Sequence, residues 1–519
     1  MTQTRASNTG MEDHVTRVKN AWSAFTSSCS WVPLGSITFL GGWEQLLTEN
    51  QGDATWIEQV AAAFTAAGGG SLSHHALDLA ASAVSPMSDR DLLEALSSLS
   101  AAELSALLTA SPGLQAQLKL MDPSAINAWW AGLNPSPTGT DRFSEQQDLL
   151  LTTFPLLFGN LEGVPYGARD YANQIALTAA IADLEARIAE AKALVGDTSV
   201  ANGPVPSALL DMKQSLLDME RQLGALTNIN KALSSPAGGS RRYLISLTED
   251  HPPLAAVSIG DLDTATNITY AVPGMGTTTH GMTGWAKAAQ NLHGMLPPGS
   301  AVVAWIGYET PPTPGVGDPD FGVLDVNRAV AGGNTLATAL GGLAAVRGGA
   351  VPQLTIVAHS YGTTAAAVAL SQPGIRVNNF ITLGSAGLPD SVHSAADLNA
   401  DRVYSGHARD KYPGERESGD QWAWIGRDTS RDHRVNPLSP GFGAQGFGVE
   451  TGGDAGRVVT DHNPLMGNGD EAGYFDQRTE SLQNMVWAIK GETEKITPYA
   501  PLGPTNLQEA LIEGLSNGY

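Results

Sequence analysis

The feature that most constrains this chain is a short turn between a buried strand and a helix, in the sequence Gln-Leu-Thr-Ile-Val-Ala-His-Ser-Tyr-Gly at 353–362. The residues just before Ala358 are apolar and mostly β-branched, and the alanine-rich segment after Gly362 favours a helix. Ser360 is therefore expected on a tight turn that holds its hydroxyl clear of the backbone. Such a turn needs small residues two positions before and two after the serine, and Ala358 and Gly362 meet that need.

The pentapeptide motif by itself is weak evidence, because a chain so rich in Gly, Ala and Ser contains roughly one match by chance. A second match, at 514–518, is centred on Ser516. It lies near the end of the sequence, with no predicted strand before it and no room for a helix after it. The context therefore selects Ser360 as the candidate nucleophile and rejects Ser516.

Composition limits the size of the domains and the kinds of partner. A chain of 519 residues is expected to form two or three domains, and 42% hydrophobic with 16% charged residues is typical of globular proteins. The formal net charge of −23 disfavours nucleic acid or an anionic membrane surface as the main partner, because both attract clustered Lys and Arg.

Cysteine and histidine usage gives no indication of a bound metal. The one cysteine, Cys29, excludes an intrachain disulfide and a zinc or iron–sulfur site built from cysteines. His74 and His75 have no carboxylate or cysteine at ligand spacing. We expect no metal and no cofactor.

No targeting segment or membrane span is predicted. Residues 1–10 lack a basic region followed by an apolar run, so a secretory signal is not expected. The longest membrane candidate, 31–43, is too short and too rich in glycine to cross a bilayer. We expect a protein that is cytoplasmic, or exported without a cleavable signal peptide.

Hydrophobic periodicity divides the chain into a helical part and an α/β part. Apolar residues recur at four-three spacing on both sides of a turn at 196–206, which predicts an antiparallel helical hairpin. After the Ser/Pro/Gly-rich segment 234–240 the pattern changes to alternating strands and helices. The predicted parts are a helical N-terminal region 1–173, the hairpin and linker 174–240, an α/β domain 241–495 and a C-terminal tail 496–519.

Seven strands are predicted in the α/β domain, with helices between several of them. The strand candidates are 243–247, 255–259, 268–272, 301–306, 354–357, 380–383 and 403–405, and the helical stretches lie near 281–294, 327–346 and 362–371. Such alternation predicts a doubly wound, mostly parallel sheet. Active sites of these sheets lie at the carboxyl ends of the strands.

A turn after the third predicted strand is suited to stabilising an oxyanion. Its sequence is Pro-Gly-Met-Gly-Thr-Thr at 273–278, and its backbone N–H groups can face a developing negative charge. The expected donors are the N–H of Met275 and the N–H of Tyr361, the residue after the nucleophile.

A serine nucleophile needs a base to take its proton and an acid to orient that base. With the chain order Ser, Asp, His, the acid is expected at Asp410, just past the strand 403–405. Asp397 and Asp401 precede that strand and are expected at the surface. Only two histidines follow Asp410, namely His433 and His462.

Chain order does not decide between the two histidines, but position favours His462. It is the last histidine before the C-terminal helix at 479–490, and Arg457–Val459 ahead of it could end the final strand. His433 lies between two arginines, which disfavour a protonated imidazole. We therefore expect His462 as the base, with His433 as the alternative.

Several motifs between residues 243 and 490 are long enough to be specific. They are 259–265, 272–277, 304–312, 357–362, 442–444 and 474–476. With these motifs the chain resembles an actinobacterial α/β-hydrolase family that was long catalogued as a domain of unknown function. The Trp129-Trp130 pair and residues 159–173 look like the helical region that often precedes the hydrolase in that family.

The resemblance implies an α/β-hydrolase fold and a serine hydrolase acting through Ser360, and it supports Asp410 and a late histidine. One departure concerns the base. In that family a histidine lies one or two residues before a Tyr-Phe pair, whereas residues 463–473 separate His462 from Tyr474. These residues look like an insertion.

Two functional hypotheses follow. The first is an esterase-like or lipase-like serine hydrolase that cleaves a carboxylic ester or related acyl bond, in a small or lipid-like substrate, through an acyl-enzyme. The second is an interaction protein or signal-less secretion substrate, whose helical half docks a partner or self-associates beside a vestigial hydrolase fold. Folding alone does not require a Ser, Asp and His set, which favours the first hypothesis.

Overall fold

The computed structural model describes residues 88–110, 112–134, 142–197, 207–313, 320–348, 353–466 and 469–516. The sequence predictions for Cys29, for His74 and His75 and for 31–43 lie outside these residues. Contacts between residues divide the chain into two compact units, Met1–Leu157 and Phe158–Tyr519. The helices on both sides of the predicted hairpin turn therefore belong to the same unit as the sheet. The domain boundaries predicted at 173, 240 and 495 stay predictions.

The first unit is helical where it is described. Its helices are α4 (Asp89–Ser98), α5 (Ala101–Ala110), α6 (Pro112–Leu120), α7 (Pro123–Gly132) and α8 (Glu145–Thr153), and the short α9 (Pro155–Phe158) crosses into the second unit. Ser88 caps α4 and Asp122 caps α7, each by accepting backbone N–H groups of the first turn. Trp129 and Trp130 are buried and pack edge to face, so this pair is part of the core.

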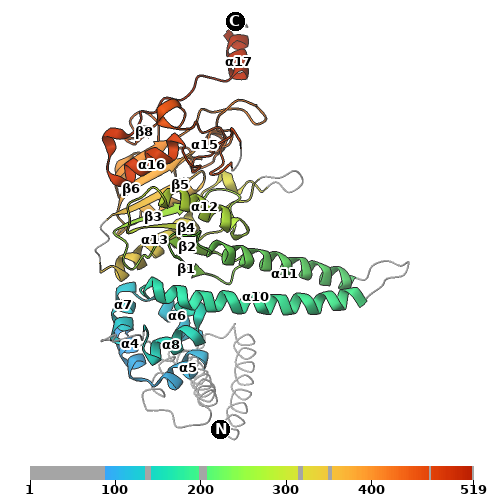
Figure 1. Cartoon of the computed structure of the whole chain (residues 1–519), viewed down its shortest axis with the longest axis vertical. Helices are drawn as coiled ribbons and strands as arrows, with labels where there is room; N and C mark the ends of the chain where they lie inside the picture. The colour runs from blue at the N-terminus through green and yellow to red at the C-terminus, as the bar shows by residue number, and fades with distance from the viewer. Residues whose placement is uncertain are drawn as a thin grey trace, which may run out of the picture. The chain divides into compact units, whose positions relative to one another are not determined.

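Two long helices, α10 (Tyr166–Asp197) and α11 (Ser207–Ala232), form a hairpin at the start of the second unit (Figure 1). Apolar residues of both helices are buried, among them Leu184, Ile188 and Leu209. The N-terminal turns of α10 contact strand β1, and α11 contacts the segment just after the turn 273–278. The hairpin is therefore attached to the sheet and to the region where the site lies.

The second unit contains one eight-stranded sheet. The strands are β1 (Arg242–Leu247), β2 (Ala255–Ile259), β3 (Asn267–Val272), β4 (Ser300–Ile306), β5 (Leu354–His359), β6 (Val377–Leu383), β7 (Ala400–Gly406) and β8 (Gln445–Phe447). Their order is β1-β2-β4-β3-β5-β6-β7-β8, and β2 runs in the opposite direction to the other seven strands. This architecture confirms the predicted mostly parallel, doubly wound sheet.

The predicted and observed strands differ in two places. β8 was not predicted, because three residues give too short a pattern to recognise. Arg457–Val459, predicted as the end of the last strand, forms only an isolated bridge from Arg457 to Thr479. That prediction was wrong, and β8 is the last strand of the sheet.

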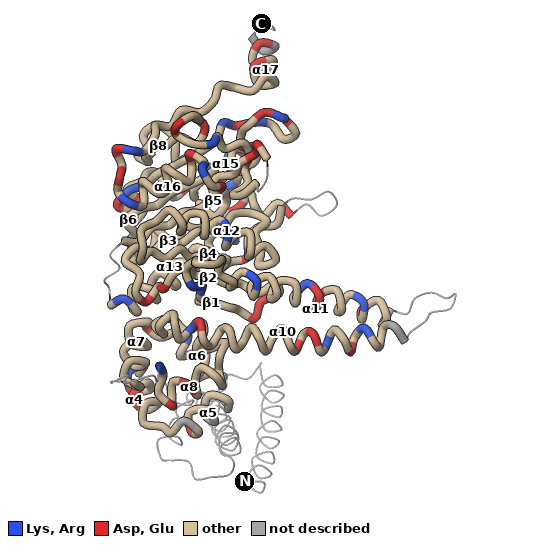
Figure 2. Tube along the Cα trace, viewed as in Figure 1, with Lys and Arg blue, Asp and Glu red and all other residues tan. Residues whose placement is uncertain are grey.

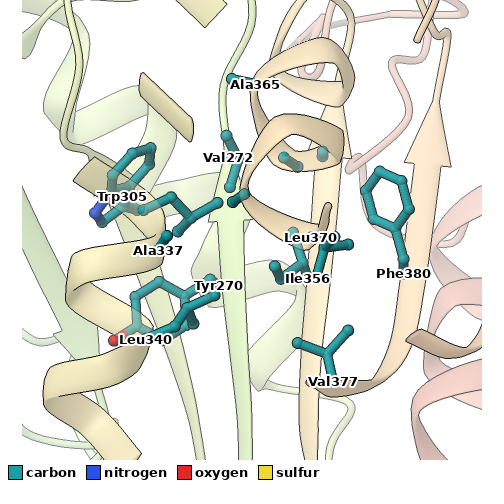
Figure 3. Close-up of a cluster of buried hydrophobic side chains, with 14 of the residues drawn as sticks. Tyr270, Val272, Trp305, Ala337, Leu340, Ile356, Ala365, Leu370, Val377 and Phe380 are labelled. Carbon is teal, nitrogen blue, oxygen red and sulfur yellow. The ribbon is translucent and has the colours of Figure 1, made fainter. Parts of the chain in front are cut away.

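The remaining helices of the second unit follow the strands. They are α12 (Met282–His293), α13 (Asn327–Val346), α14 (Gly362–Leu370), α15 (Ala423–Thr429), α16 (Glu480–Lys490) and α17 (Asn506–Ser516). Alternate strand residues such as Tyr270, Val272 and Ile356 join α13 and α14 in one apolar cluster (Figure 3). Side chains of α12 and α16 do not belong to this cluster, and these helices contact β4 and β6 separately. The central strands are thus buried, which fits their continuous apolar sequences.

Polar side chains from the segment before α10 and from the first turns of α10 bond the backbone of the edge strand β1. Asn160 bonds both the N–H and the carbonyl of Leu247, with donor–acceptor distances of 2.8 and 2.7 Å. Asp170 and Asn173 bond the N–H and the carbonyl of Leu244, at 2.8 and 3.0 Å. Because an open edge strand can pair with other chains, these residues have a structural role.

Among the described helices, α13 is long and apolar enough to cross a membrane, with a mean hydropathy of 1.3 in its best window. Its buried residues, including Leu336, Leu340 and Leu343, belong to the apolar cluster on the sheet. We therefore interpret α13 as a core helix of the α/β layers.

The turn between β5 and α14 is built as the sequence predicts. Ser360 has a φ of 56°, which is rare for a residue other than glycine, and its N–H donates to the Leu383 carbonyl of β6 at 2.9 Å. A Cβ at Gly362 would lie 2.4 Å from the carbonyl oxygen of Pro273. The turn therefore closes only with glycine at 362, while Ala358 is accommodated within β5.

This close approach predicts that Gly362→Ala destabilises the protein. The added methyl group meets backbone atoms that cannot move without shifting the turn after β3, so we expect a loss of about 1–3 kcal/mol in the free energy of unfolding. Gly341→Ala is the control, because an added Cβ there meets no atom within 4 Å on α13. It should stabilise by up to about 1 kcal/mol. Equal stabilities in urea denaturation would contradict this account of the turn.

Candidate active site

Three side chains form one hydrogen-bonded chain at the carboxyl ends of the strands. The Ser360 hydroxyl lies 2.9 Å from Nε2 of His462. Nδ1 of His462 lies 2.9 and 2.8 Å from the two carboxylate oxygens of Asp420. With the proton on Nδ1 donated to Asp420, Nε2 is free to accept the proton of the serine.

Asp420 is an ionised group held in a dry environment. Its side chain has no solvent exposure. The N–H groups of Trp422 and Ala423 each donate to Oδ1 at 2.9 Å, and the Tyr474 hydroxyl donates to Oδ2 at 3.0 Å. Burial by itself raises the pKa of this carboxyl, but the His462 ring and the hydrogen bonds outweigh burial and hold the pKa well below its usual range.

The structure does not bring the predicted acid, Asp410, to His462. Its carboxylate bonds Nε2 of His407 at 2.7 Å and lies 4.0 Å from the Arg427 guanidinium, with 44% of the side chain exposed. The position beside His462 belongs to Asp420, so the prediction is corrected. Asp410 and Asp420 form a parallel bridge, and the loop between them brings the later residue under the histidine.

Asp420 was missed because the prediction looked only just past the strand end. The sequence does contain a signal. Asp420 precedes α15 by three residues, and its side chain accepts the N–H groups of Trp422 and Ala423 as an N-cap residue does. An aspartate that caps a helix in the expected chain order would have been a second candidate.

His433, the alternative base, forms no hydrogen bond with Ser360 among the described contacts. Its ring is buried, with Nδ1 2.9 Å from the Ala386 carbonyl and Nε2 3.0 Å from the Val323 carbonyl. Both nitrogens are thus engaged with backbone oxygens. The geometry favours His462, as the sequence predicted.

His359 supports His462 from the other side. Its Nε2 lies 2.7 Å from the backbone carbonyl of His462, and the two rings are 4.8 Å apart. Burial, with a smaller effect from His462, lowers the pKa of His359 to about 3. His359 is therefore neutral at physiological pH and donates its proton to the loop that carries His462.

The two ends of the apparent insertion between His462 and Tyr474 are hydrogen-bonded to each other. The N–H of Tyr474 donates to the Asn463 carbonyl at 3.3 Å, and the N–H of Phe475 donates to the Pro464 carbonyl at 2.8 Å. The two ends of the loop are thus joined. Tyr474 stays beside His462 and Asp420 in spite of the eleven residues between them.

The predicted oxyanion turn packs directly against the nucleophile. A Cβ at Gly274 would lie 2.9 Å from the Ser360 hydroxyl oxygen, so Met275 is one residue from contact with it. Tyr361 lies at the start of α14. Among the described residues, none accepts a hydrogen bond from the N–H of Met275 or the N–H of Tyr361. Both donors are therefore available to a ligand.

Within the described part of the chain, no three His, Cys, Asp or Glu side chains gather in a way that could hold a metal ion. A serine, a histidine and an aspartate in this arrangement can carry out proton transfer and nucleophilic attack.

Comparison with known proteins identifies the fold. A family model described as "Alpha/beta hydrolase" matches residues 250–412. This segment contains β2 to β7, the oxyanion turn and Ser360, and it ends before Asp420 and His462. Together with the sheet order, the match establishes an α/β-hydrolase fold and supports a hydrolase. The finer resemblance to an actinobacterial family stays a prediction.

Two curated proteins of Mycobacterium tuberculosis, from strains CDC 1551 and H37Rv, are 28% identical to this chain over 398 residues. Both are described as uncharacterized, and the match covers 72% of this chain and 56% of each relative. This chain therefore spans about half the length of those relatives.

Among solved structures, esterase PE8 is 12% identical with a TM-score of 0.29, over 46% of this chain and 98% of its own. A hyperthermophilic esterase from the archaeon Pyrobaculum calidifontis is also 12% identical, with a TM-score of 0.27. That similarity covers 59% of this chain and 96% of the esterase.

The lowered pKa of His359 predicts how stability depends on pH. Between about pH 3 and 6.5 the unfolded histidine binds a proton that the folded one does not, so stability falls as pH falls through this window. One such proton contributes a slope of up to about 1.4 kcal/mol per pH unit. We expect His359→Gln to reduce that slope in urea denaturation at pH 4.5, 5.5 and 6.5.

His393→Gln is the control for this measurement, because it makes the same chemical change at an exposed side chain. Its slope should equal that of the wild type. The assignment of His359 as a buried neutral donor is wrong if His359→Gln and His393→Gln show the same dependence on pH.

Proposed function

We propose that this protein is a serine hydrolase that cleaves a carboxylic ester or related acyl bond through an acyl-enzyme. Ser360 is the nucleophile, His462 the general base and Asp420 the acid that orients the base. The backbone N–H groups of Met275 and Tyr361 stabilise the oxyanion. Asp420 takes the role that the sequence assigned to Asp410.

The observation that carries this proposal is the continuous chain from the Ser360 hydroxyl through the His462 ring to the buried carboxylate of Asp420. Folding does not need these three types in contact, and burying a carboxylate is costly unless it is paired. The strained backbone of Ser360 adds support, because such conformations cluster at functional sites.

In the first step, the Ser360 oxygen attacks the acyl carbon while Nε2 of His462 takes the serine proton. The imidazolium that forms is stabilised by Asp420, whose low pKa keeps it charged throughout the physiological range. The same proton then passes to the leaving oxygen. Water attacks the acyl-enzyme in the second step, again with His462 as the base.

The negative charge of the tetrahedral intermediate develops on the former carbonyl oxygen. The N–H groups of Met275 and Tyr361 follow two different strand ends, those of β3 and β5, and Tyr361 is next to Ser360 in the chain. Neither is engaged by another described group, so no bond within the protein must break when the oxyanion forms. Losing one such donor typically costs about 10²–10³ in turnover.

This assignment predicts a sharp difference between two aspartates. With p-nitrophenyl butyrate as the substrate, Asp420→Asn should lower kcat by about 10⁴, because an amide in that place favours the wrong tautomer of His462. Ser360→Ala should lower kcat by several orders of magnitude. Steady-state release of p-nitrophenol measures both effects.

Asp410→Asn is the matched control, since it makes the same chemical change ten residues earlier, outside the hydrogen-bonded chain. It should keep kcat within about tenfold of the wild type. A large loss in Asp410→Asn with little loss in Asp420→Asn would return the acid to the sequence prediction. Turnover that survives Ser360→Ala would reject the serine mechanism.

A further inference from the structure

A hollow of about 650 Å³ opens beside the oxyanion turn. Gly276 and Thr277 form one wall, and they follow Met275 directly in the chain. Because consecutive Cα atoms are about 3.8 Å apart and Gly274 touches Ser360, the hollow begins within about 10 Å of the nucleophile. Tyr308 lines the hollow and donates to the Pro273 carbonyl at 2.7 Å.

A second hollow, of about 760 Å³, lies along the helical hairpin. It is lined by α10 and α11 on one side and by His280 after the oxyanion turn. His251 and Pro252 line both hollows, so the two are neighbours. We call them together the trough. It runs from the oxyanion turn to the hairpin, within one compact unit.

Most residues that line the trough carry a polar group, namely eleven of the seventeen around the first hollow and nine of the twelve around the second. Carbon atoms still make up more than half of the exposed lining surface, so the trough presents hydrogen-bonding groups and apolar surface together. A long acyl chain in the trough would leave hydroxyls and carboxylates without water, at about 1–3 kcal/mol for each unbonded group.

The charges of the trough disfavour an anionic ligand. Three carboxylates and one guanidinium line the first hollow, and that guanidinium, Arg328, already pairs with Asp320 at 3.1 Å and Glu309 at 3.3 Å. In the second hollow, Arg187 and Arg221 pair with neighbouring aspartates on their own helices at 3.3 and 3.4 Å. Both signs alternate along the hairpin (Figure 2). Each described arginine that lines the trough thus already pairs with a carboxylate, which disfavours a carboxylate or phosphate ligand.

The lining instead offers acceptors for hydroxyl groups. Asp250 contributes a carboxylate to the first hollow, and Thr277, Thr278 and Thr313 contribute hydroxyl groups. The prolines of the lining, such as Pro252, add small apolar patches against which the carbon–hydrogen face of a sugar ring can pack. Neutral, donor-rich ligands with apolar faces suit this combination.

We propose that the trough binds the alcohol portion of the substrate, and that this portion is a neutral polyhydroxylated group such as an oligosaccharide. This inference rests on the proposed serine-hydrolase function. The Ser360 oxygen forms a bond to the acyl carbon as the bond from that carbon to the sugar oxygen breaks. The serine proton passes through His462 to the sugar oxygen. Water then supplies hydroxide to the acyl carbon and returns the proton to Ser360.

The test compares acetate release from mono-acetylated xylobiose and cellobiose with release from acetylcholine and from p-nitrophenyl acetate, and adds release of octanoate from trioctanoylglycerol. We expect kcat/KM for the better sugar ester to exceed the values for acetylcholine and trioctanoylglycerol by at least tenfold. Higher values for either of those two would overturn the inference in favour of a cationic or a lipid alcohol.

Ser215→Trp tests the trough itself, because Ser215 of α11 lines the second hollow and an indole there would occupy part of it. The ratio of kcat/KM for the sugar ester to kcat/KM for p-nitrophenyl acetate should fall at least tenfold. Ala189→Trp, an exposed position of α10 that does not line the trough, is the matched control and should leave the ratio unchanged. Should Ser215→Trp fail to fold, Asp250→Asn tests the first hollow by the same ratio.

The failures of the two proposals are distinguishable. Turnover of p-nitrophenyl acetate that survives Ser360→Ala rejects the serine hydrolase itself. Turnover that depends on Ser360, with an unchanged ratio in both Ser215→Trp and Asp250→Asn, rejects only the role of the trough.

Discussion

The pairing of His462 with the buried carboxylate of Asp420 is the interaction on which the rest of the site depends. A carboxylate without solvent exposure is stable only if its charge is compensated, and Asp420 receives hydrogen bonds from a histidine, a tyrosine and two backbone N–H groups. These partners come from three separate segments of the chain. Ionisation of one side chain thus fixes the loop before α15, the loop carrying His462 and the segment that begins at Tyr474.

The sheet makes this convergence possible. Ser360, Asp420 and His462 are separated by sixty and forty-two residues in the sequence, yet β5, β7 and β8 are close in a parallel array whose carboxyl ends lie at one edge. The turn after β3 reaches the same edge because β3 is the neighbour of β5. Gly274 packs closely against Ser360, and Gly362 packs closely against the turn after β3, which sets the distance between the serine and the proposed oxyanion donors.

Much of this fold could be predicted from the sequence, because the central strands are continuous apolar runs and the helices between them have clear periods. The sequence also selected Ser360 over Ser516 and His462 over His433 by context. What it could not provide was the path of the loops. The loop after β7 folds back so that the N–H of Lys411 donates to the Asp420 carbonyl and the N–H of Asp420 donates to the Arg409 carbonyl. Asp410 and Asp420, ten residues apart in the sequence, are therefore paired in one β-bridge. The sequence prediction used only the position after the strand end, and this position pointed to Asp410.

The same reasoning applies to the residues between His462 and Tyr474, which depart from the spacing in the resembling family. In the sequence, an insertion shifts Tyr474 away from His462. In the structure, a loop whose two ends are hydrogen-bonded leaves the flanking residues in place. The closing bonds at Asn463 and Pro464 depend on tertiary structure and have no local sequence signature.

The most direct test of the central claim is to map the covalent adduct of a fluorophosphonate by peptide mass spectrometry. Such reagents phosphonylate a serine, with loss of fluoride, only where a base and an oxyanion site activate it. This account predicts one adduct, on Ser360, that is abolished in Asp420→Asn at short reaction times and unaffected in Ser516→Ala. An adduct on Ser516, or a folded wild-type protein that acquires none, would contradict it.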